Sequence, residues 1–256
     1  MNKDERDMAR AFADLDYEGF RRLAKRSDLS RYQRIGFPDS LRAGREGEIF
    51  RDICAKLPLL DQGKELTILD IGPGCSDLPN LIVDHCKARK NRLILVDSLE
   101  MLAELPEGDG IEKILGPFPR CAPLLEELRG AVDVILCYSV LHYVFVEGQV
   151  FGFLDAALKL LRPGGGMMLI GDIPNVSMRR RFLASAAGAA FHRAYTGSDV
   201  PAEPGFNQAA EGEMDDAVLI SLVSRARAAG VDAWIVYQPP HLPMSNRRED
   251  LIFRRP

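Results

Sequence analysis

The sequence predicts an α/β protein built on a doubly wound, mostly parallel sheet of seven strands, which a closing antiparallel hairpin completes. Short apolar runs alternate with helical patterns from about residue 61 onward, as expected for parallel strands joined by helices. The first run, residues 67–71, breaks into a glycine turn before a helical pattern, and the run at residues 93–97 ends in an acid. A strand, turn and helix in this order are typical of nucleotide-binding sheets.

The composition limits the classes of protein to consider. At 256 residues with 46% hydrophobic content, the chain is long enough for one domain with a smaller appendage. A formal net charge of -4 and a pI near 5.7 argue against nucleic-acid binding through bulk charge. The five cysteines lack the spacing of metal ligands, so we expect reduced thiols and no metal site. Because no apolar leader or membrane-spanning run is visible, we expect a cytoplasmic protein that acts on a small molecule, without membrane or nucleic-acid partners.

Residues 1–60 form a predicted helical section that precedes the sheet. Met8, Phe12 and Leu15 have helical spacing, and a second helix is expected to end in the basic stretch at residues 21–26. A further helix over residues 44–57 leads into the first strand.

Between these helices, residues 29–40 contain turn residues, aromatic side chains and arginines with little periodicity. We interpret this stretch as a loop that covers a binding site, with Tyr32 as a substrate contact. A simple packing linker is the alternative interpretation.

The glycine turn defines the predicted ligand site. Gly72 and Gly74 follow the first strand, where the absence of a Cβ allows a sharp turn and the close approach of a ligand. The dinucleotide-binding fingerprint has a third glycine, but this chain has Asp77 there, and a carboxylate at a helix start repels a pyrophosphate. Ser76 is placed to cap the helix that follows. The turn therefore suits a ligand without phosphates, with Asp70 at the end of the strand.

Asp97 ends the second apolar run, 27 residues after Asp70. This separation leaves room for one helix and a return strand. An acid in this position accepts hydrogen bonds from ribose hydroxyls in nucleotide-binding sheets. An ordinary acid at a strand end is the alternative interpretation.

The remaining elements follow in order along the chain. We expect a short helix at residues 99–105 and three strands at residues 111–115, 132–137 and 167–171, the last of them after a Pro-Gly-Gly turn at residues 162–166. A helix at residues 215–229 precedes two final strands, residues 233–237 and 250–253. The loop between these strands is too short for a crossover helix, so they are expected to pair antiparallel.

Residues 174–213 do not fit a strand–helix repeat and are predicted to form a substrate cap. A segment inserted after the end of a strand falls over the ligand crevice of such a sheet. Its arginines Arg179, Arg180 and Arg181 suit an anionic substrate, and a solvated basic helix face is the alternative.

Three motifs in the expected order resemble those of class I S-adenosylmethionine-dependent methyltransferases. The pattern Asp70-x-Gly72-x-Gly74 resembles the first motif of that family, and Val140-Leu141-His142 is similar to the fourth. The stretch Leu161-Arg162-Pro163-Gly164-Gly165 resembles the family's turn before the fifth strand. The resemblance covers the predicted cofactor-binding domain, residues 61–256, which follows the helical N-terminal section or lid, residues 1–60.

The same resemblance implies S-adenosyl-L-methionine as cofactor and S-adenosyl-L-homocysteine as product. Asp70, Gly72 and Gly74 would surround the methionine part, and Asp97 would bind the ribose. The other implied cofactor contacts are Ser98 and Leu99 beside the adenine, Phe118 as an apolar contact, and Tyr138 and Ser139 near the amino-acid part or the methyl group.

Methyl transfer to a hydroxyl group needs a base, because the oxygen must lose its proton during the attack. His142 and Asp172 follow strand ends on the cofactor side and His192 lies in the cap, so these three residues are the candidates. Orienting a loop is the alternative role for His142, and capping a turn is the alternative for Asp172. Tyr143 is expected to contact the substrate.

The acceptor is predicted from a narrower resemblance. Residues 35–40, 171–175 and 243–250 are similar to stand-alone methyltransferases of bacterial surface-polysaccharide and acidic-sugar gene clusters. That similarity implies methylation of a sugar or a nucleotide sugar, whose phosphate or carboxylate would meet the cap arginines. A small carboxylic acid and a protein side chain are other acceptors. Two other classes stay open: a non-catalytic binding protein that kept the cofactor fold, and an NAD-dependent oxidoreductase.

Overall fold

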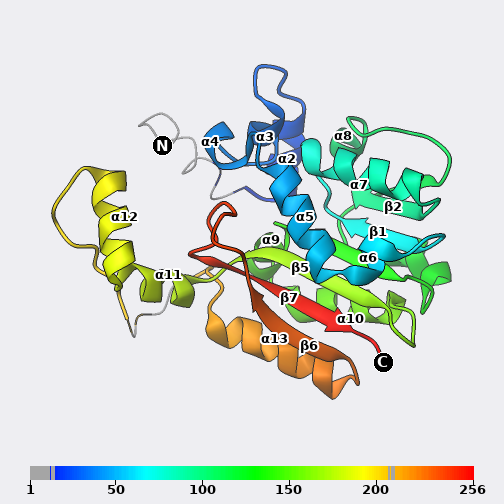
Figure 1. The fold of residues 1–256 in the computed structure, drawn as a ribbon. Helices are drawn as coiled ribbons and strands as arrows, with labels where there is room; N and C mark the ends of the chain where they lie inside the picture. Colours follow the sequence, from blue (N-terminus) through cyan, green and yellow to red (C-terminus); the bar gives the residue numbers. More distant parts are fainter. Residues whose placement is uncertain (1–11, 13–14, 207, 209–210) are drawn as a thin grey trace.

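The computed structural model describes residue 12, residues 15–206, residue 208 and residues 211–256, with a seven-stranded sheet at its centre (Figure 1). The strand order is β3-β2-β1-β4-β5-β7-β6. The strands are β1 (Thr67–Ile71), β2 (Arg92–Asp97), β3 (Ile111–Leu115), β4 (Val134–Tyr138), β5 (Met167–Pro174), β6 (Asp232–Tyr237) and β7 (Arg248–Arg254). The first five strands are parallel, and β7 pairs antiparallel with both β5 and β6. The predicted fold class is therefore confirmed, including the closing hairpin.

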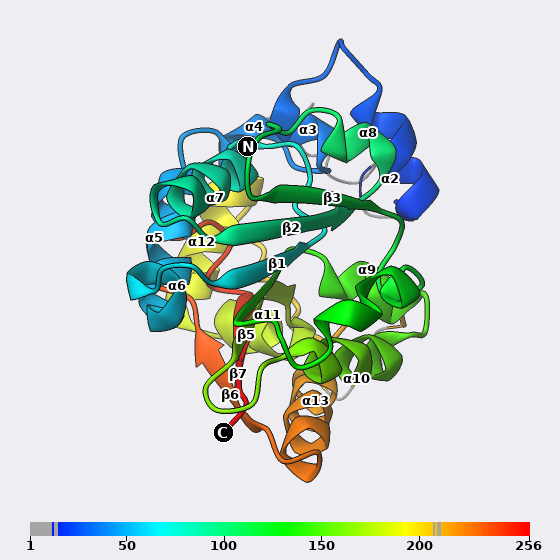
Figure 2. The ribbon, with the colours of Figure 1, turned by 90° about the vertical axis from the view of Figure 1, so that its right-hand side faces the viewer.

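Helices cover both faces of the sheet, as Figure 2 shows. One face is covered by α5 (Glu46–Lys56), α6 (Pro58–Gln62) and α7 (Asp77–Ala88), and the other by η1 (Ala122–Leu128), α10 (Val150–Leu160) and α13 (Asp216–Ala228). Within β1, Ile68 belongs to the apolar core that includes residues of α5, α6 and α7, and Leu69 belongs to the core that includes residues of η1, α10 and α13. Because successive side chains of a strand point to opposite faces, a strand that is covered on both faces reads as a continuous apolar run.

β5 is longer than the strand predicted at residues 167–171. After a bulge between Ile170 and Ile173, the strand pairs again with β7 and continues to Pro174. Asp172 lies in this bulge with a positive φ of 60°. A bulge changes the direction of a side chain, and here the Asp172 carboxylate accepts a hydrogen bond from Ser139 at the end of β4.

The N-terminal section contains more helix than predicted. α2 (Tyr17–Ala24) corresponds to the predicted second helix, whereas the predicted first helix lies mostly outside the described residues. Residues 29–40, expected as a loop, contain α3 (Arg31–Arg34) and α4 (Asp39–Arg42). Ser30 and Gln33 form a reciprocal capping box at the start of α3, and the Ser-x-x-Gln spacing that signals it is visible in the sequence.

Ion pairs attach the N-terminal section to the rim of the sheet. Arg21 of α2 pairs with Glu100 of α8 (Leu99–Leu102), a helix shorter than the predicted 99–105, at 2.9 Å. Arg31 and Tyr32 both bond to the carboxylate of Asp77 at the start of α7. Asp77, which replaces the third glycine of the dinucleotide fingerprint, therefore holds residues 29–40 against the sheet domain.

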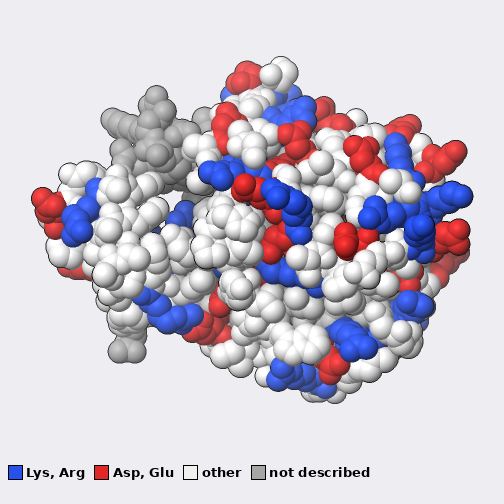
Figure 3. Space-filling model, in the orientation of Figure 1, with Lys and Arg blue, Asp and Glu red and all other residues white. Residues whose placement is uncertain are grey.

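The predicted cap segment contains two helices, α11 (Val176–Leu183) and α12 (Ala186–Thr196). They form an arm that leaves the end of β5 and projects from the side of the molecule (Figure 1). Figure 3 shows a hollow between this arm and the body of the protein, with Lys and Arg atoms visible in it. Elsewhere on that face, acidic and basic side chains are interspersed.

Among the described residues, no helix has both the length and the apolar character needed to cross a bilayer.

Candidate functional site

A cavity lies at the carboxyl ends of β1, β2 and β4, with about 990 Å³ of space between protein atoms, part of it open to solvent. Parallel sheets of this type bind their ligands at this edge. On the sheet side, its wall includes Gly72, Gly74, Asp97, Phe118, Tyr138 and Ser139. The N-terminal section supplies Tyr17, Phe20, Ile35, Phe37, Arg42 and Glu46. Among the described residues of the predicted cap, residues 174–213, none lines the cavity.

The glycine turn is needed for both its backbone conformation and its neighbours. Gly72 and Gly74 have φ values of +71° and +68°, which residues with a Cβ rarely adopt. A Cβ on Gly72 would lie 2.5 Å from a methyl carbon of Val140, and one on Gly74 would lie 2.8 Å from a methyl carbon of Ile35. Because these two positions lack a Cβ, Val140, which precedes α9 (Leu141–Val146), and Ile35 of the N-terminal section can pack directly against the turn.

Asp97 is fixed at the end of β2 by two backbone donors. Its carboxylate accepts hydrogen bonds from the N–H of Gly74 at 3.0 Å and from the N–H of Ser98 at 2.6 Å. Burial raises the pKa of Asp97 to about 6, although both backbone donors act against this effect. The carboxylate is thus held in one orientation on the cavity wall, beside the glycine turn.

Three of the predicted cofactor residues lie off the main cavity wall. Asp70 is 3% exposed and borders a small adjoining hollow, and burial followed by the charge of Asp97 raises the pKa of Asp70 to about 7. Ser98 is buried and its hydroxyl caps α8 by accepting from the N–H of Met101. Leu99 is 60% exposed. The structure therefore brings Gly72, Gly74, Asp97, Phe118, Tyr138 and Ser139 together at the cavity, and these three residues do not line it.

The sequence analysis did not assign Tyr17 and Phe20 of α2, or Phe37 between α3 and α4, to the cavity. Tyr17, Phe20 and Phe37 line it, and the ring of Phe20 packs edge-on against Tyr143 with centroids 4.8 Å apart. Burial, followed by the charge of Asp97, raises the pKa of Tyr17 to about 12. Apolar spacing in α2 indicates a buried face, but it does not reveal which surface covers that face.

Asp172 is the centre of a polar cluster next to the cavity. One carboxylate oxygen accepts from Arg42 at 3.0 Å, from Arg248 at 2.9 Å and from the hydroxyl of Ser139. Ser139, like Asp172, has a positive φ, of 62°. Non-glycine residues with positive φ are strained and persist only where the surroundings hold them. The two arginines and the serine provide that hold here.

His142 lies beside this cluster on α9. Its ring packs against that of Tyr143 in a tilted arrangement, with centroids 3.9 Å apart, and its buried Nδ1 atom has no hydrogen-bond partner in the described part of the chain. Burial, followed by the charge of Arg248, lowers the pKa of His142 to about 3. The imidazole is therefore neutral near pH 7. Neither His142 nor His192, which lies on α12, is part of the cavity wall.

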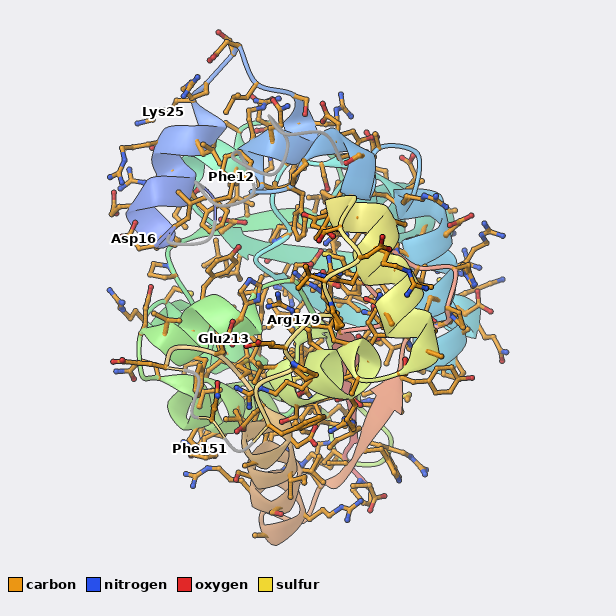
Figure 4. All side chains as sticks on the ribbon, turned by 90° about the vertical axis from the view of Figure 1, so that its left-hand side faces the viewer. Phe12, Asp16, Lys25, Phe151, Arg179 and Glu213 are labelled. Carbon is orange, nitrogen blue, oxygen red and sulfur yellow. The ribbon has the colours of Figure 1, made fainter. Side chains whose placement is uncertain are left out.

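The three predicted cap arginines have different environments. Arg181 pairs with Asp216 at the start of α13, whereas the guanidinium of Arg179 makes no hydrogen bond or ion pair with any described residue. Figure 4 shows Arg179 near the middle of the view, between α11 and the N-terminal helices. Burial, followed by the charges of Arg248 and Arg179, lowers the pKa of Arg247 to about 10. Arg180 is partly buried on α11.

The remaining site predictions also have definite positions. Tyr143 lines the cavity, whereas Tyr32 does not, and its hydroxyl donates to Asp77 at the start of α7. Within the described residues, no group of three or more His, Cys, Asp or Glu side chains is arranged to hold a metal ion.

No protein-family model and no curated protein matches the chain. Solved structures match across most of its length. The CurJ carbon methyltransferase superposes with a TM-score of 0.57 at 12% identity, covering 98% of this chain and 68% of that one. The methyltransferase domain of bacterial CtHen1-C superposes with a TM-score of 0.51 at 14% identity, covering 82% of this chain and 96% of that domain.

A third match is phosphoethanolamine N-methyltransferase 1 of Haemonchus contortus, solved in complex with phosphoethanolamine and S-adenosylhomocysteine. Its TM-score is 0.56 at 18% identity, with 94% of this chain and half of that one covered. At these identities the matches define the fold, which is that of class I methyltransferases.

Proposed function

We propose that this protein transfers a methyl group from S-adenosylmethionine to a small anionic acceptor, such as a sugar or a nucleotide sugar. The observation that carries this proposal is the cavity at the carboxyl edge of a methyltransferase-type sheet, with Gly72, Gly74 and Asp97 on its wall. The H. contortus protein, which has the same fold, binds S-adenosylhomocysteine together with a phosphate-bearing small molecule.

The cavity wall suits the parts of this cofactor. The Asp97 carboxylate, oriented by two backbone donors, would accept hydrogen bonds from the ribose hydroxyls. Apolar and aromatic side chains such as Tyr17 and Phe118 would contact the adenine. Tyr138 and Ser139 would lie near the sulfonium, because they stand at the carboxyl end of β4 and line the cavity.

His142 is the best candidate for a base. Methyl transfer moves a lone pair of the acceptor onto the methyl carbon while the carbon–sulfur bond breaks, so an acceptor hydroxyl must lose its proton to a neighbouring group. The Nδ1 atom of His142 has no partner among the described residues and would take that proton. His142 does not line the cavity and its pKa of about 3 makes it a weak base, so this role requires that the bound acceptor reach the ring and raise its pKa. Asp172 is less suited, because two guanidinium groups already neutralise its carboxylate. We assign Asp172 to positioning.

The anionic character of the acceptor rests on basic residues beyond the Asp172 cluster. The guanidinium of Arg179 has no hydrogen-bond or ion-pair partner among the described residues, and Arg247 shares its surroundings with Arg179 and Arg248. Asp172 is the carboxylate that acts on Arg247, but it is already bonded to two other arginines. A carboxylate or phosphate of the acceptor would complete this group.

Calorimetric titration of the purified protein with S-adenosylhomocysteine and, separately, with NAD tests the cofactor. We expect binding of the first ligand only, and binding of NAD alone would overturn the proposal. Transfer of a labelled methyl group would then be measured with glucuronate, glucose 1-phosphate and a nucleotide sugar, with uncharged glucose as the comparison. Cofactor binding without transfer to any charged acceptor would favour a non-catalytic protein.

A further inference from the structure

Two oppositely charged side chains of the N-terminal section are buried at the cavity wall. Arg42 ends α4 and Glu46 begins α5, and their residues are only 2% and 3% exposed. Both line the cavity, on the side that contains the glycine turn and Ser139. Charged residues are rarely buried to this extent unless a partner compensates them.

Arg42 is only partly compensated. Its Nη2 atom donates to Asp172 at 3.0 Å and to the Ser139 hydroxyl at 2.5 Å, and its guanidinium lies over the Phe37 ring, 4.2 Å from the centroid. Its buried Nε atom has no hydrogen-bond partner among the described residues. Because Arg248 pairs with the same Asp172 carboxylate, two positive groups share one negative group. The free Nε can therefore donate to one further acceptor, such as a carboxylate.

Glu46 shows the opposite deficiency. Its Oε2 atom accepts from the N–H of Leu78 and so caps α7, a role that the Ser76 side chain does not fill. Its Oε1 atom is buried and has no hydrogen-bond partner among the described residues. Burial raises the pKa of Glu46, although the charge of Arg42 and the hydroxyl of Ser76 act against it. A cationic group beside Oε1 would relieve this cost.

We propose that Arg42 and Glu46 together bind the zwitterionic amino-acid end of the cofactor. Arg42 would donate from Nε to the α-carboxylate, and Glu46 would accept from the α-ammonium group through Oε1. A zwitterion supplies both missing charges at once, whereas a simple anion or cation would satisfy only one of the two side chains. This assignment rests on the proposed cofactor, and it places two of its contacts outside the sheet domain.

The location of the pair agrees with this orientation. Glu46 caps the helix that directly follows the glycine turn, and Arg42 contacts Ser139 at the end of β4. Asp97, which we assign to the ribose, bonds to Gly74 on the far side of the same turn. The cofactor would thus extend from Asp97 across the turn to Arg42 and Glu46.

Calorimetry with two ligands tests the assignment without any measurement of methyl transfer. S-adenosylhomocysteine carries the amino-acid end, and 5′-methylthioadenosine has the same nucleoside and thioether without it. Glu46→Gln and Arg42→Gln should each weaken binding of S-adenosylhomocysteine about 10-fold or more, because each removes a charge-assisted hydrogen bond. Binding of 5′-methylthioadenosine should change less than about 2-fold, and this ligand also reports that the variant is folded.

The neighbouring residues provide matched controls. Arg45 and Glu48 pair with each other at 3.5 Å and do not line the cavity, so Arg45→Gln and Glu48→Gln should leave both affinities unchanged. If Arg42→Gln binds neither ligand, Glu46→Gln decides, because glutamine can still accept from Leu78. An equal loss for both ligands in Glu46→Gln, or no loss for S-adenosylhomocysteine, overturns the assignment. Failure of the wild-type protein to bind S-adenosylhomocysteine overturns the proposed function instead.

Discussion

Replacing Asp97 by asparagine should raise the stability of the protein near neutral pH and at the same time weaken its binding of the cofactor. Burial raises the pKa of Asp97 from 3.8 to about 6 in the ligand-free protein. An acid whose pKa is raised by folding destabilises the folded state once it ionises. The loss therefore begins as the pH rises above the unfolded pKa near 3.8 and is complete above about 6. A pKa shift of this size corresponds to a destabilisation of at most about 3 kcal/mol, and screening by water in the cavity makes the destabilisation smaller.

The asparagine variant escapes this loss because it cannot ionise. It has a single carbonyl oxygen, so one of the N–H groups of Gly74 and Ser98 loses its acceptor, which costs about 1 kcal/mol at every pH. The stability of the variant relative to wild type should therefore rise by up to about 3 kcal/mol between pH 4 and pH 8. Asp70 adds to this effect. The charge of Asp97 contributes to the raised pKa of Asp70, so removing that charge also lowers the cost of ionising Asp70.

Urea unfolding at a series of pH values from about 4 to 8 measures this difference. The exposed Asp109 provides a control, and Asp109→Asn should show no such trend. Calorimetry should show that Asp97→Asn has lost most of its affinity for S-adenosylhomocysteine, because a ribose acceptor is gone. A stability difference that does not change with pH would refute the assignment of a buried, costly carboxylate at this position.

Three further predictions concern the acceptor side and the turn. His142→Ala should lower kcat about 100-fold or more, as for loss of a general base, while calorimetry shows unchanged affinity for S-adenosylhomocysteine. Gly74→Ala should lower Tm by several degrees and weaken cofactor binding, because its φ is +68° and the new Cβ would meet Ile35; an unchanged Tm would contradict this. Arg179→Gln should raise KM for an anionic acceptor about 10-fold without changing KM for a neutral one, whereas Arg181→Gln, which loses only its pair with Asp216, should leave KM unchanged.

The fold could be predicted from the sequence because its signals are local. Most of the buried parallel strands are largely apolar runs, β1 ends before a glycine turn, β2 ends in an acid, and a Pro-Gly-Gly turn precedes β5. The bulge in β5 was not predictable, because it depends on how β7 pairs with that strand. The capping box of Ser30 and Gln33 was a local signal that the sequence analysis did not use.

The site was only half predictable, for the same physical reason. Gly72, Gly74 and Asp97 belong to the strand ends whose position follows from the sheet itself. Arg42 and Asp172 are 130 residues apart, so their ion pair depends on how the N-terminal section docks. The sequence makes Asp172 a candidate base because it follows a predicted strand. The sequence does not show that two arginines pair with its carboxylate.

The N-terminal section sets the geometry of the site as well as covering it. Ser139 and Asp172 both have positive φ values at the ends of neighbouring strands, and such conformations cost about 1–3 kcal/mol each. Arg42 donates to both of these side chains from α4, so its docking compensates strain in β4 and β5. A boundary at residue 60 divides the chain in sequence, but the residues that would hold the cofactor come from both sides of it. Removal of the section would therefore be expected to alter the ends of the strands themselves, and not simply to open the cavity.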